Sequence, residues 1–558
     1  MVSTSHQPTE SPNLSLQMGD ITQESDRPVR IMVVGDSMSH GREGDFTWRY
    51  RLWQWLIEEN VNFEFVGPYE GTKTPDQPRP PQPPALKDDP PPVPDVPIDH
   101  GGYAAGVQFK SHHFSSWGRQ ATQCKDLIEE QVARFRPDYL LVMLGFNDMG
   151  WGVADAGNTL GAMKKLVDNA RTAKSNVRFA LADVPMRTPI DGAERLPPMV
   201  EEYNQLLRLS ISRWTALESP IELVEVRRGY HCFRGSYDGL HPNVLGEFQI
   251  AKAFSQTLSQ KFLIGTKDLT IPHEIPQRPT PVPTNVVAAA VPYGVSVRWD
   301  RVYGAIGYDV RIRNNDNRPW NESRADVAQY NSTWTQEGQE YQYQVRTFNG
   351  ESLRSAWSST VSTIAHPKTA PGPRNIITKP SLYRVLVKWE KPQGQVEVDR
   401  YEIILVDLSL PGSFPNTVAV RATDTTFTDL SAGHRYRLAI STWTDCGGGI
   451  PAGGRNFIAG NGKPPIPTQL QVEVQDITTV HLKWKESKGA AGYRVWVRNL
   501  VKKSDFVEDG ETDSAEYGIA FLIPDASNFE FCVSAYNGSL ESEKSGSIVP
   551  IRGDIESR

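Results

Sequence analysis

The sequence predicts a multidomain protein in which an α/β three-layer domain is followed by three all-β sandwiches. A chain of 558 residues is too long for a single hydrophobic core. Before residue 265, short apolar runs alternate with amphipathic segments, which is typical of strands alternating with helices. Beyond it, apolar and polar residues alternate with a period of two, and one pattern of aromatic residues recurs along the chain.

The first region contains the elements of a parallel sheet. Strands are expected at 31–34, 139–144, 177–182 and 221–226, and helices at 48–59, 123–136, 159–171, 199–215 and 242–263. The run 139–144 is wholly apolar, as expected for a strand that is buried on both faces. Alternation of this kind predicts a parallel sheet with helices on both sides.

A proline-rich insertion interrupts this region. Residues 68–97 hold twelve prolines in thirty residues, which excludes regular structure and favours an extended, polyproline-like segment. A lid over the site and a ligand for a partner are open alternatives, and a solvated surface loop is the favoured one.

Composition excludes some classes of protein. The formal net charge of −7 argues against nucleic acid as a partner. No apolar run is long enough for a transmembrane segment. Residues 1–28 are polar, show no secretory signal and are expected to be a disordered tail.

The four cysteines are too few for a disulfide framework or a metal cluster. Cys124 and Cys232 could pair with each other, and two separate reduced thiols are the favoured alternative.

The second region repeats three aromatic marks. Each repeat has a Trp at the end of an alternating run, a Tyr that opens the next run, and a later aromatic residue: Trp299, Tyr308 and Tyr341; Trp389, Tyr401 and Tyr436; Trp484, Tyr493 and Phe529. Repetition of short alternating runs at this spacing predicts three consecutive β-sandwiches.

These repeats resemble fibronectin type III domains, which have an immunoglobulin-like sandwich fold. The resemblance implies domains at 285–366, 368–462 and 464–553, after a linker at 265–284. In the third repeat Phe529 stands where the family has a corner Tyr, so the corner hydroxyl bond is expected to be absent there. Such modules bind a polymer or a protein, or act as spacers, and the spacer role is favoured.

Chemistry-bearing residues follow the first predicted strand. Gly35-Asp36-Ser37-Met38 comes directly after residues 31–34, so the Ser37 hydroxyl is expected at the carboxyl end of a parallel strand, where α/β sheets place their ligands. Alone this signal is weak, because a serine after such a turn is often a helix cap.

An Asp–His pair precedes the last helix of the region. Asp238 and His241 stand three residues apart at a turn, so the carboxylate can hold one imidazole nitrogen while the other faces a nucleophile. A metal site is not expected, because no further ligands stand nearby at a suitable spacing.

Two further blocks could stabilise an oxyanion. Asn147 follows the strand 139–144, where its side-chain amide could donate a hydrogen bond, although an Asn-Asp pair is by default a turn. Gly118 precedes the helix at 123–136, and its backbone N–H is accessible because the residue has no Cβ.

In this order, Gly-Asp-Ser, a lone Gly, Gly-x-Asn-Asp and Asp-x-x-His resemble the four-block signature of SGNH (GDSL-like) hydrolases over residues 29–264. The resemblance implies a flavodoxin-like fold and a serine esterase that acts without cofactor or metal. It implies Ser37 as nucleophile, Asp238 and His241 as its partners, and Ser37, Gly118 and Asn147 as oxyanion hole. Met38 replaces the usual Leu, and block two lacks the common pattern, which makes Gly118 the weakest assignment.

Other residues have weaker claims. Asp36 and Asp148 are expected to stabilise turns, and three histidines are expected mainly at the surface: His100, His112 and His113. Three tryptophans of the segment 48–55 are expected mainly in the core, whereas Trp151 is the better candidate for the substrate cleft.

Residues 30–37 and 48–52 resemble the acetylxylan-esterase-like branch of the superfamily, which implies short acyl esters, such as acetyl groups on a polysaccharide, as substrates. A lipase-like or lysophospholipase-like activity and a non-catalytic adhesion protein are the alternatives. The module resemblance implies an extracellular location, whereas the absence of a visible signal peptide leaves a cytoplasmic one open.

Overall fold

The computed structural model describes residues 27–89, 100–190, 193–314, 318–410, 415–460 and 462–551. The predicted tail therefore lies almost wholly outside the described residues, as does the end of the proline-rich insertion. The chain forms two compact units. The first consists of residues 1–74, 98–188 and 196–278, and the second of residues 75–97, 189–195 and 279–558.

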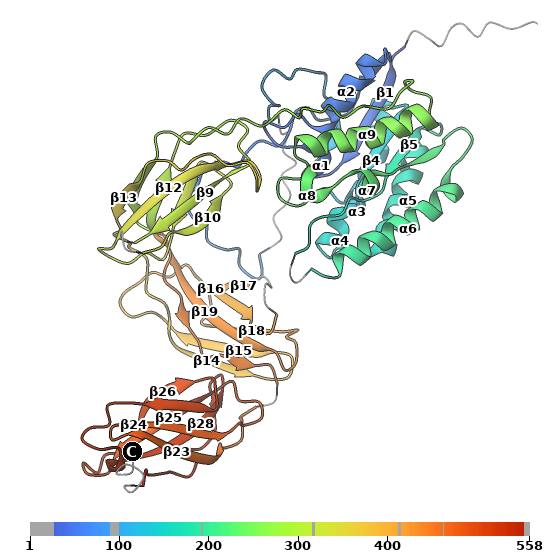
Figure 1. The fold of residues 1–558 in the computed structure, drawn as a ribbon. Coiled ribbons are helices and arrows are strands. Elements are labelled where there is room, and N and C mark those ends of the chain that lie inside the picture. The colour runs from blue at the N-terminus through green and yellow to red at the C-terminus, as the bar shows by residue number, and fades with distance from the viewer. Residues whose placement is uncertain are drawn as a thin grey trace, which may run out of the picture. The chain divides into compact units, whose positions relative to one another are not determined.

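The first unit is built on a six-stranded parallel sheet (Figure 1). Its strands are β1 (Val29–Gly35), β2 (Phe63–Phe65), β3 (Phe114–Ser115), β4 (Tyr139–Met143), β5 (Arg178–Ala182) and β6 (Ile221–Val224). Their order is β2-β1-β4-β5-β6, and the short β3 pairs with the end of β1. All residues of β4 are buried, as expected for a central strand. The prediction of a parallel α/β domain is confirmed.

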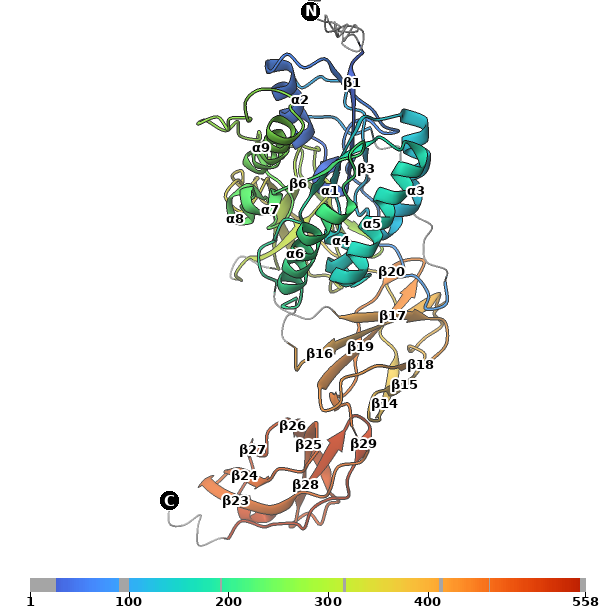
Figure 2. The same ribbon diagram turned by 90° about the vertical axis from the view of Figure 1, so that its right-hand side faces the viewer.

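Helices cover both faces of this sheet (Figure 2). Helices α2 (Trp48–Glu58) and α9 (Val244–Lys261) pack together on one face. On the other face α3 (Ala121–Phe135) packs against α5 (Ala156–Ala173), which in turn contacts α6 (Leu196–Trp214). The rings of Trp48 and Phe254 stack with their centroids 4.5 Å apart and join α2 to α9 in the core.

Four one-turn helices lie near the ends of strands or before α9: α1 (Ser37–His40), α4 (Phe146–Gly150), α7 (Val226–Gly229) and α8 (Cys232–Gly235). The strand order reverses at β1, because the chain goes from β1 to β2 on one side and reaches β4 on the other. The carboxyl ends of β1 and β4 therefore flank the crevice in which open parallel sheets bind ligands. α1 follows β1 and α4 follows β4, so both helices begin at this crevice.

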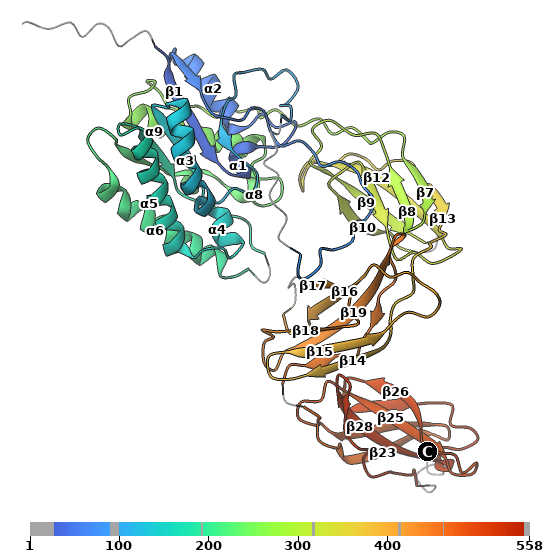
Figure 3. The ribbon, with the colours of Figure 1, turned by 180° about the vertical axis from the view of Figure 1, so that it is seen from behind.

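The second unit contains three sandwiches of antiparallel strands (Figure 3), which confirms the predicted fold class. The first pairs a sheet of β7 (Val287–Val291), β8 (Gly294–Arg298) and β11 (Gln329–Ser332) with a sheet of β9 (Gly307–Arg313), β10 (Asn321–Ala325), β12 (Glu340–Phe348) and β13 (Val361–Ile364).

The second sandwich has β14 (Arg374–Pro380), β15 (Val385–Glu390) and β18 (Asp424–Phe427) in one sheet. Its other sheet is formed by β16 (Arg400–Asp407), β17 (Asn416–Val420), β19 (Arg435–Thr444), β20 (Gly447–Gly448), β21 (Ala452–Gly453) and β22 (Phe457–Ile458). The third has β23 (Thr468–Asp476), β24 (Thr479–Lys485) and β27 (Glu516–Ile519) against β25 (Gly492–Asn499), β26 (Val507–Thr512), β28 (Phe529–Asn537) and β29 (Leu540–Glu541), and a 3-10 turn spans Ala526–Asn528.

Each sandwich is organised around the same aromatic pair. The Trp and Tyr rings meet edge to face at centroid distances of 5.0, 5.3 and 5.2 Å for Trp299–Tyr308, Trp389–Tyr401 and Trp484–Tyr493. The corner hydroxyls of Tyr341 and Tyr436 each accept a backbone N–H from five residues upstream, at 3.0 Å. Phe529 has no hydroxyl with which to do so. The repeated Trp and the Tyr that opens the next run are therefore buried core positions of one repeated fold, and the later aromatic residue is buried in the second sandwich and packs against the core in the other two.

The described part of the proline-rich insertion, 75–89, packs against the sandwiches in the second unit. Gln329 and Asn331 of the first sandwich donate to the carbonyl of Arg79, and the Lys87 N–H donates to the carbonyl of Ala419 in the second. The solvated loop favoured by composition is thus a docked, extended segment in this structure. Composition reports the lack of regular structure but contains no information about a docking surface.

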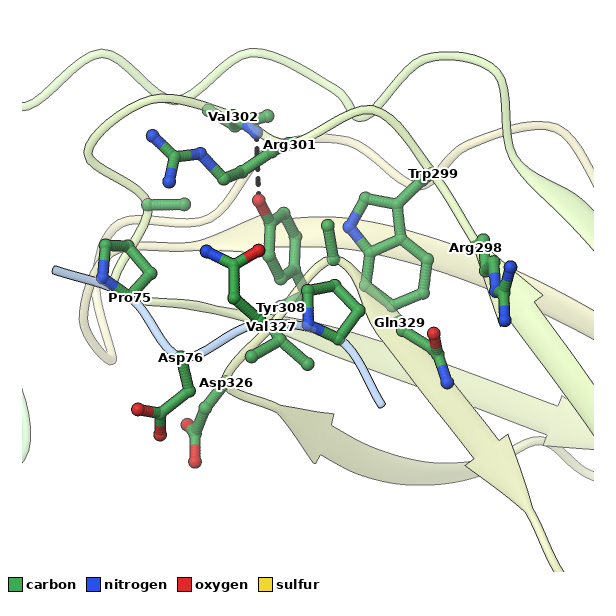
Figure 4. Close-up of a pocket in the computed structure, with 14 residues that line it drawn as sticks. Pro75, Asp76, Arg298, Trp299, Arg301, Val302, Tyr308, Asp326, Val327 and Gln329 are labelled. Atoms are coloured by element: carbon green, nitrogen blue, oxygen red, sulfur yellow. Dashed lines mark hydrogen bonds between the residues drawn. The ribbon is translucent and has the colours of Figure 1, made fainter. Parts of the chain in front are cut away.

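A cavity of about 500 Å³ lies between residues 75–78 and the first sandwich (Figure 4). Trp299 and Tyr308 line it, and the Tyr308 hydroxyl accepts the Val302 N–H. The Trp299 indole N–H is buried and unpaired, but so are those of Trp389 and Trp484 in the other two sandwiches. The unpaired indole is therefore a property of the sandwich core and does not mark a ligand site.

Candidate active site

Ser37 is the first residue of α1, immediately after β1. The Asp36 carboxylate caps this turn by accepting the Met38 N–H at 2.9 Å, and burial raises the pKa of Asp36 to about 6. A Cβ at Gly35 would lie 2.3 Å from Ser39 Oγ, so only glycine allows the chain to fold back so tightly between strand and helix. The sequence thereby places a serine side chain at the crevice.

His241 and Asp238 meet Ser37 there. His241 Nε2 lies 2.9 Å from Ser37 Oγ, and His241 Nδ1 lies 2.6 Å from Asp238 Oδ2. Burial acts to raise the pKa of Asp238, but hydrogen bonds from the His241 ring and from the backbone outweigh it and hold this pKa below its usual value. Asp238 thus stays ionised beside the imidazole, and a base is in place to take the Ser37 proton.

The turn that carries the pair is fixed by its own backbone. Asp238 Oδ1 accepts the N–H groups of Leu240 and His241 at 3.0 and 2.8 Å, which leaves Oδ2 for the imidazole. Gly239 has φ of +88°, and a Cβ there would lie 2.0 Å from Thr188 Oγ1. The Thr188 N–H also donates to the Gly239 carbonyl at 2.8 Å. A residue other than glycine would therefore displace the turn.

Gly118 reaches the same crevice by way of β3. Gly35 pairs with Ser115, and the Ser116 N–H donates to the Gly35 carbonyl at 3.1 Å, so the turn that follows β3 lies beside the start of α1. Gly118 has φ of +75°, and a Cβ there would lie 3.0 Å from the Trp151 ring. Conformation and space thus both require glycine at this position.

Asn147 lies on α4, after β4. Its Nδ2 donates to the Arg119 carbonyl at 3.0 Å, which orients the amide and leaves its second N–H for another acceptor. The neighbouring Asp148, fully buried, accepts the N–H groups of Ala121 and Thr122 at 2.7 and 2.9 Å, at the start of α3. Asp148 therefore joins the Asn147 block to the Gly118 block, a role beyond the turn stabilisation that the sequence predicted.

The tryptophans and histidines that were weaker candidates differ widely in their burial. Trp48 and Trp55 are buried in the core and Trp53 is partly buried, whereas Trp151 is 61% exposed and packs over Gly118. His100 is exposed, and His112 pairs with Glu70 at 2.8 Å. His113, expected mainly at the surface, is fully buried instead, because it directly precedes β3 and pairs with Tyr69 through two backbone hydrogen bonds.

Sequence reasoning missed Arg49 and His40. Arg49 is 1% exposed and donates to the carbonyls of Ser39, His40, Gly71 and Ser111 at 2.8 to 3.1 Å. His40 Nδ1 accepts the Trp117 N–H at 3.2 Å, and burial followed by the charge of Arg49 lowers the pKa of His40 to about 3. A neutral His40 thus links α1 to the turn after β3. The available signal for Arg49 was an arginine three residues before Leu52, on the side of the predicted helix that the apolar residues mark as buried.

Arg49→Lys is expected to destabilise the first unit by about 3 kcal/mol, because a lysine cannot satisfy four carbonyls in a plane and leaves buried acceptors unpaired. The measurement is the midpoint of thermal inactivation. Arg134→Lys, on the exposed side of α3, is the matched control and should not shift it. Equal midpoints for both variants would contradict this role of Arg49.

Among the described residues, no group of three or more His, Cys, Asp and Glu side chains is arranged to hold a metal ion. Cys124, Cys232, Cys446 and Cys532 are free thiols, so Cys124 and Cys232 are not paired in this structure. No helix in the described ranges has the length and apolar character needed to cross a bilayer.

A parallel α/β domain that brings a Ser, a His and an Asp side chain together at the carboxyl edge of its sheet has the arrangement found in serine hydrolases. Residues 33–247 match the family model described as GDSL-like Lipase/Acylhydrolase family, and residues 370–454 match the fibronectin type III domain. Residues 33–247 therefore form a GDSL-like acylhydrolase domain, an SGNH-type ester hydrolase, and residues 370–454 form a fibronectin type III domain.

Solved structures similar to this chain include enzymes and modules. A carbohydrate esterase family 3 from Talaromyces cellulolyticus is 21% identical, with 42% of this chain and 98% of that chain covered and a TM-score of 0.33. A Clostridium thermocellum family 3 carbohydrate esterase is 20% identical, with 43% and 100% covered and a TM-score of 0.32. The chicken CNTN1 FN1-FN3 domains are 15% identical, with 49% and 99% covered and a TM-score of 0.18. Similarities this distant do not identify a substrate.

Proposed function

We propose that Ser37 is the nucleophile of this ester hydrolase, that His241 is its general base, and that Asp238 orients the imidazole. Two contacts support this proposal most directly: Ser37 Oγ lies 2.9 Å from His241 Nε2, and His241 Nδ1 lies 2.6 Å from Asp238 Oδ2. A serine hydroxyl attacks an ester at neutral pH only when a base takes its proton, and this arrangement supplies the base. His241 takes the Ser37 proton and passes it to the alcohol that leaves when the acyl-enzyme forms, and a water activated by His241 then hydrolyses the acyl-enzyme to the acid and free Ser37.

The proposed oxyanion hole consists of the N–H groups of Ser37 and Gly118 and the side-chain amide of Asn147. The free second N–H of Asn147 and the Cβ-less backbone at Gly118 support this assignment. Donors fixed before the reaction stabilise the negative charge of the tetrahedral intermediate without reorganising.

Asn147→Ala is expected to lower kcat by roughly 10²–10³, with KM changed much less, because the amide donates to charge that exists only in the transition state. Initial rates with p-nitrophenyl acetate measure it. Asn158→Ala, on the exposed start of α5, serves as the control for an Asn side chain outside the crevice. A kcat within threefold of the wild-type value would remove Asn147 from the oxyanion hole.

The proposed substrates are short acyl esters, such as acetyl groups on a polysaccharide. The resemblance of residues 30–37 and 48–52 to acetylxylan-esterase-like enzymes supports this choice, as does the exposed Trp151 ring at the edge of the site, on which a sugar ring can stack. The fibronectin-type modules are proposed to act as spacers.

Labelling with a fluorophosphonate probe and peptide mapping tests the proposed nucleophile, with the label expected on Ser37 alone. Rates with p-nitrophenyl acetate, p-nitrophenyl octanoate and acetylated xylan test the substrate class. A strong preference for the octanoate would favour the lipase-like alternative. If the wild-type chain neither reacted with the probe nor hydrolysed any of these esters, but bound insoluble polysaccharide, the adhesion alternative would be favoured.

A further inference from the structure

Two aromatic rings stack on the imidazole of His241, and neither has a role in the mechanism proposed above. The ring of Trp117 lies with its centroid 4.8 Å from that of His241, at an interplanar angle of 14°. The ring of Tyr237 lies at 5.7 Å and 15°. Trp117 and Tyr237 form the aromatic pair of the active site, distinct from the Trp–Tyr pairs of the sandwiches. Offset stacking of this kind restricts how a ring can turn.

The two rings reach His241 from different elements, each with its own anchor. The Tyr237 N–H donates to the His241 carbonyl at 3.1 Å, and Ser236 and Pro242 form an antiparallel bridge, so Tyr237 and His241 face each other across a tight turn. Side chains opposite each other in such a pair lie on the same face. Tyr237 is only 5% exposed, and burial keeps its phenol neutral by raising its pKa well above the usual value.

Trp117 arrives from the turn after β3. Its backbone N–H donates to Nδ1 of the neutral His40 at 3.2 Å, and His40 belongs to the same short helix as Ser37. Both the proposed base and the proposed nucleophile are therefore anchored to α1. Ser37 is part of this helix, and His241 is connected to it through Trp117, which hydrogen-bonds to His40. Trp117 is also adjacent to Gly118 in sequence, so the ring that stacks on the proposed base and the proposed oxyanion donor lie on one short segment.

We propose that the aromatic pair consists of positioning residues for the proposed reaction: Trp117 and Tyr237 hold the His241 ring with Nε2 toward Ser37 and stabilise the imidazolium that forms in each tetrahedral intermediate. The π faces of aromatic rings attract a cation, and the imidazole is cationic only after it takes the serine or water proton. The stabilisation therefore acts on the transition state more than on the bound ester. This inference rests on the proposed role of His241.

The test compares variants that keep a ring with variants that keep only bulk. Trp117→Leu and Tyr237→Leu are each expected to lower kcat for p-nitrophenyl acetate about tenfold, with KM unchanged within twofold. Trp117→Phe and Tyr237→Phe keep a π face and should retain most of the wild-type kcat. Trp53→Leu, which removes a partly buried ring packed against Tyr50 and Phe109, is the control and should keep the wild-type kcat.

Single-turnover release of p-nitrophenol and steady-state turnover should both slow in the Leu variants, because both halves of the reaction pass through the imidazolium. A full kcat in the Leu variants, a loss confined to KM, or a Phe variant as slow as its Leu counterpart would each overturn the inference. Labelling of the folded variants by the fluorophosphonate should still reach completion at Ser37, but more slowly than in the wild-type chain, because phosphonylation also needs His241 to take the serine proton. Failure of the proposed function itself is a different result, since the wild-type chain would then neither label at Ser37 nor turn over.

Discussion

Ser37→Ala is expected to reduce kcat for p-nitrophenyl acetate by roughly four to six orders of magnitude. The hydroxyl lies 2.9 Å from His241 Nε2, and without it no acyl-enzyme can form. What remains is attack by water in a crevice that still offers an oxyanion hole, which accounts for a residual rate above that of the uncatalysed reaction. Initial rates on purified full-length chain, with thermal midpoints as a check on folding, measure the effect.

Ser39→Ala is the matched control for this prediction. Ser39 belongs to the same helical turn and is buried, but its hydroxyl accepts the Trp48 indole N–H and makes no contact with His241. Its kcat should stay in the wild-type order of magnitude. A folded Ser37→Ala chain with undiminished turnover would eliminate Ser37 as nucleophile, whatever the geometry of the crevice.

The elements of the first unit follow closely from local pattern. The helix expected at 48–59 is α2, Trp48–Glu58, because its apolar residues recur at helical spacing and bury one face. The strand expected at 221–226 ends at Val224, since Val226 already begins a one-turn helix. A single turn is too short to show a period, which explains why α1, α4, α7 and α8 were not predicted.

The site depends more on pairings between distant residues. That Ser37, Asp238 and His241 would meet could be expected from four ordered blocks, because strand ends converge in an open parallel sheet. The link from Asp148 to the start of α3 could not, since a buried carboxylate that accepts two N–H groups from 26 and 27 residues away has no local signature. The stacking of Tyr237 on His241 did have a local signature in the sequence, because residues that flank a three-residue turn tend to face each other.

The sequence also could not predict that the proline-rich insertion docks on the sandwiches. Proline content predicts an extended chain whose carbonyls lack ladder partners. Which donors satisfy them depends on surfaces that form only when the sandwiches fold, such as Gln329 and Asn331 around the Arg79 carbonyl.

Asp238→Asn is expected to lower kcat about 10⁴-fold while leaving the fold intact. The backbone N–H groups of Leu240 and His241 require an acceptor at the position of Oδ1, so the amide oxygen must take that position. The amide NH₂ then faces His241 Nδ1 and donates to it, where the carboxylate had accepted. This forces the ring proton onto Nε2, so the nitrogen that faces Ser37 can no longer accept the serine proton.

The predicted loss thus comes from the wrong tautomer, and two measurements separate it from mere weakening of the site. Nitrogen chemical shifts of His241 should show protonated Nε2 in the Asn variant and protonated Nδ1 in the wild-type chain at neutral pH. Asp238→Glu, which keeps a carboxylate at imperfect distance, should be affected less than Asp238→Asn, because an acceptor still faces Nδ1. If Asp238→Asn turned over within tenfold of the wild-type rate, the carboxylate could not be setting the tautomer, and another acceptor for Nδ1 would have to be found among the groups around the turn.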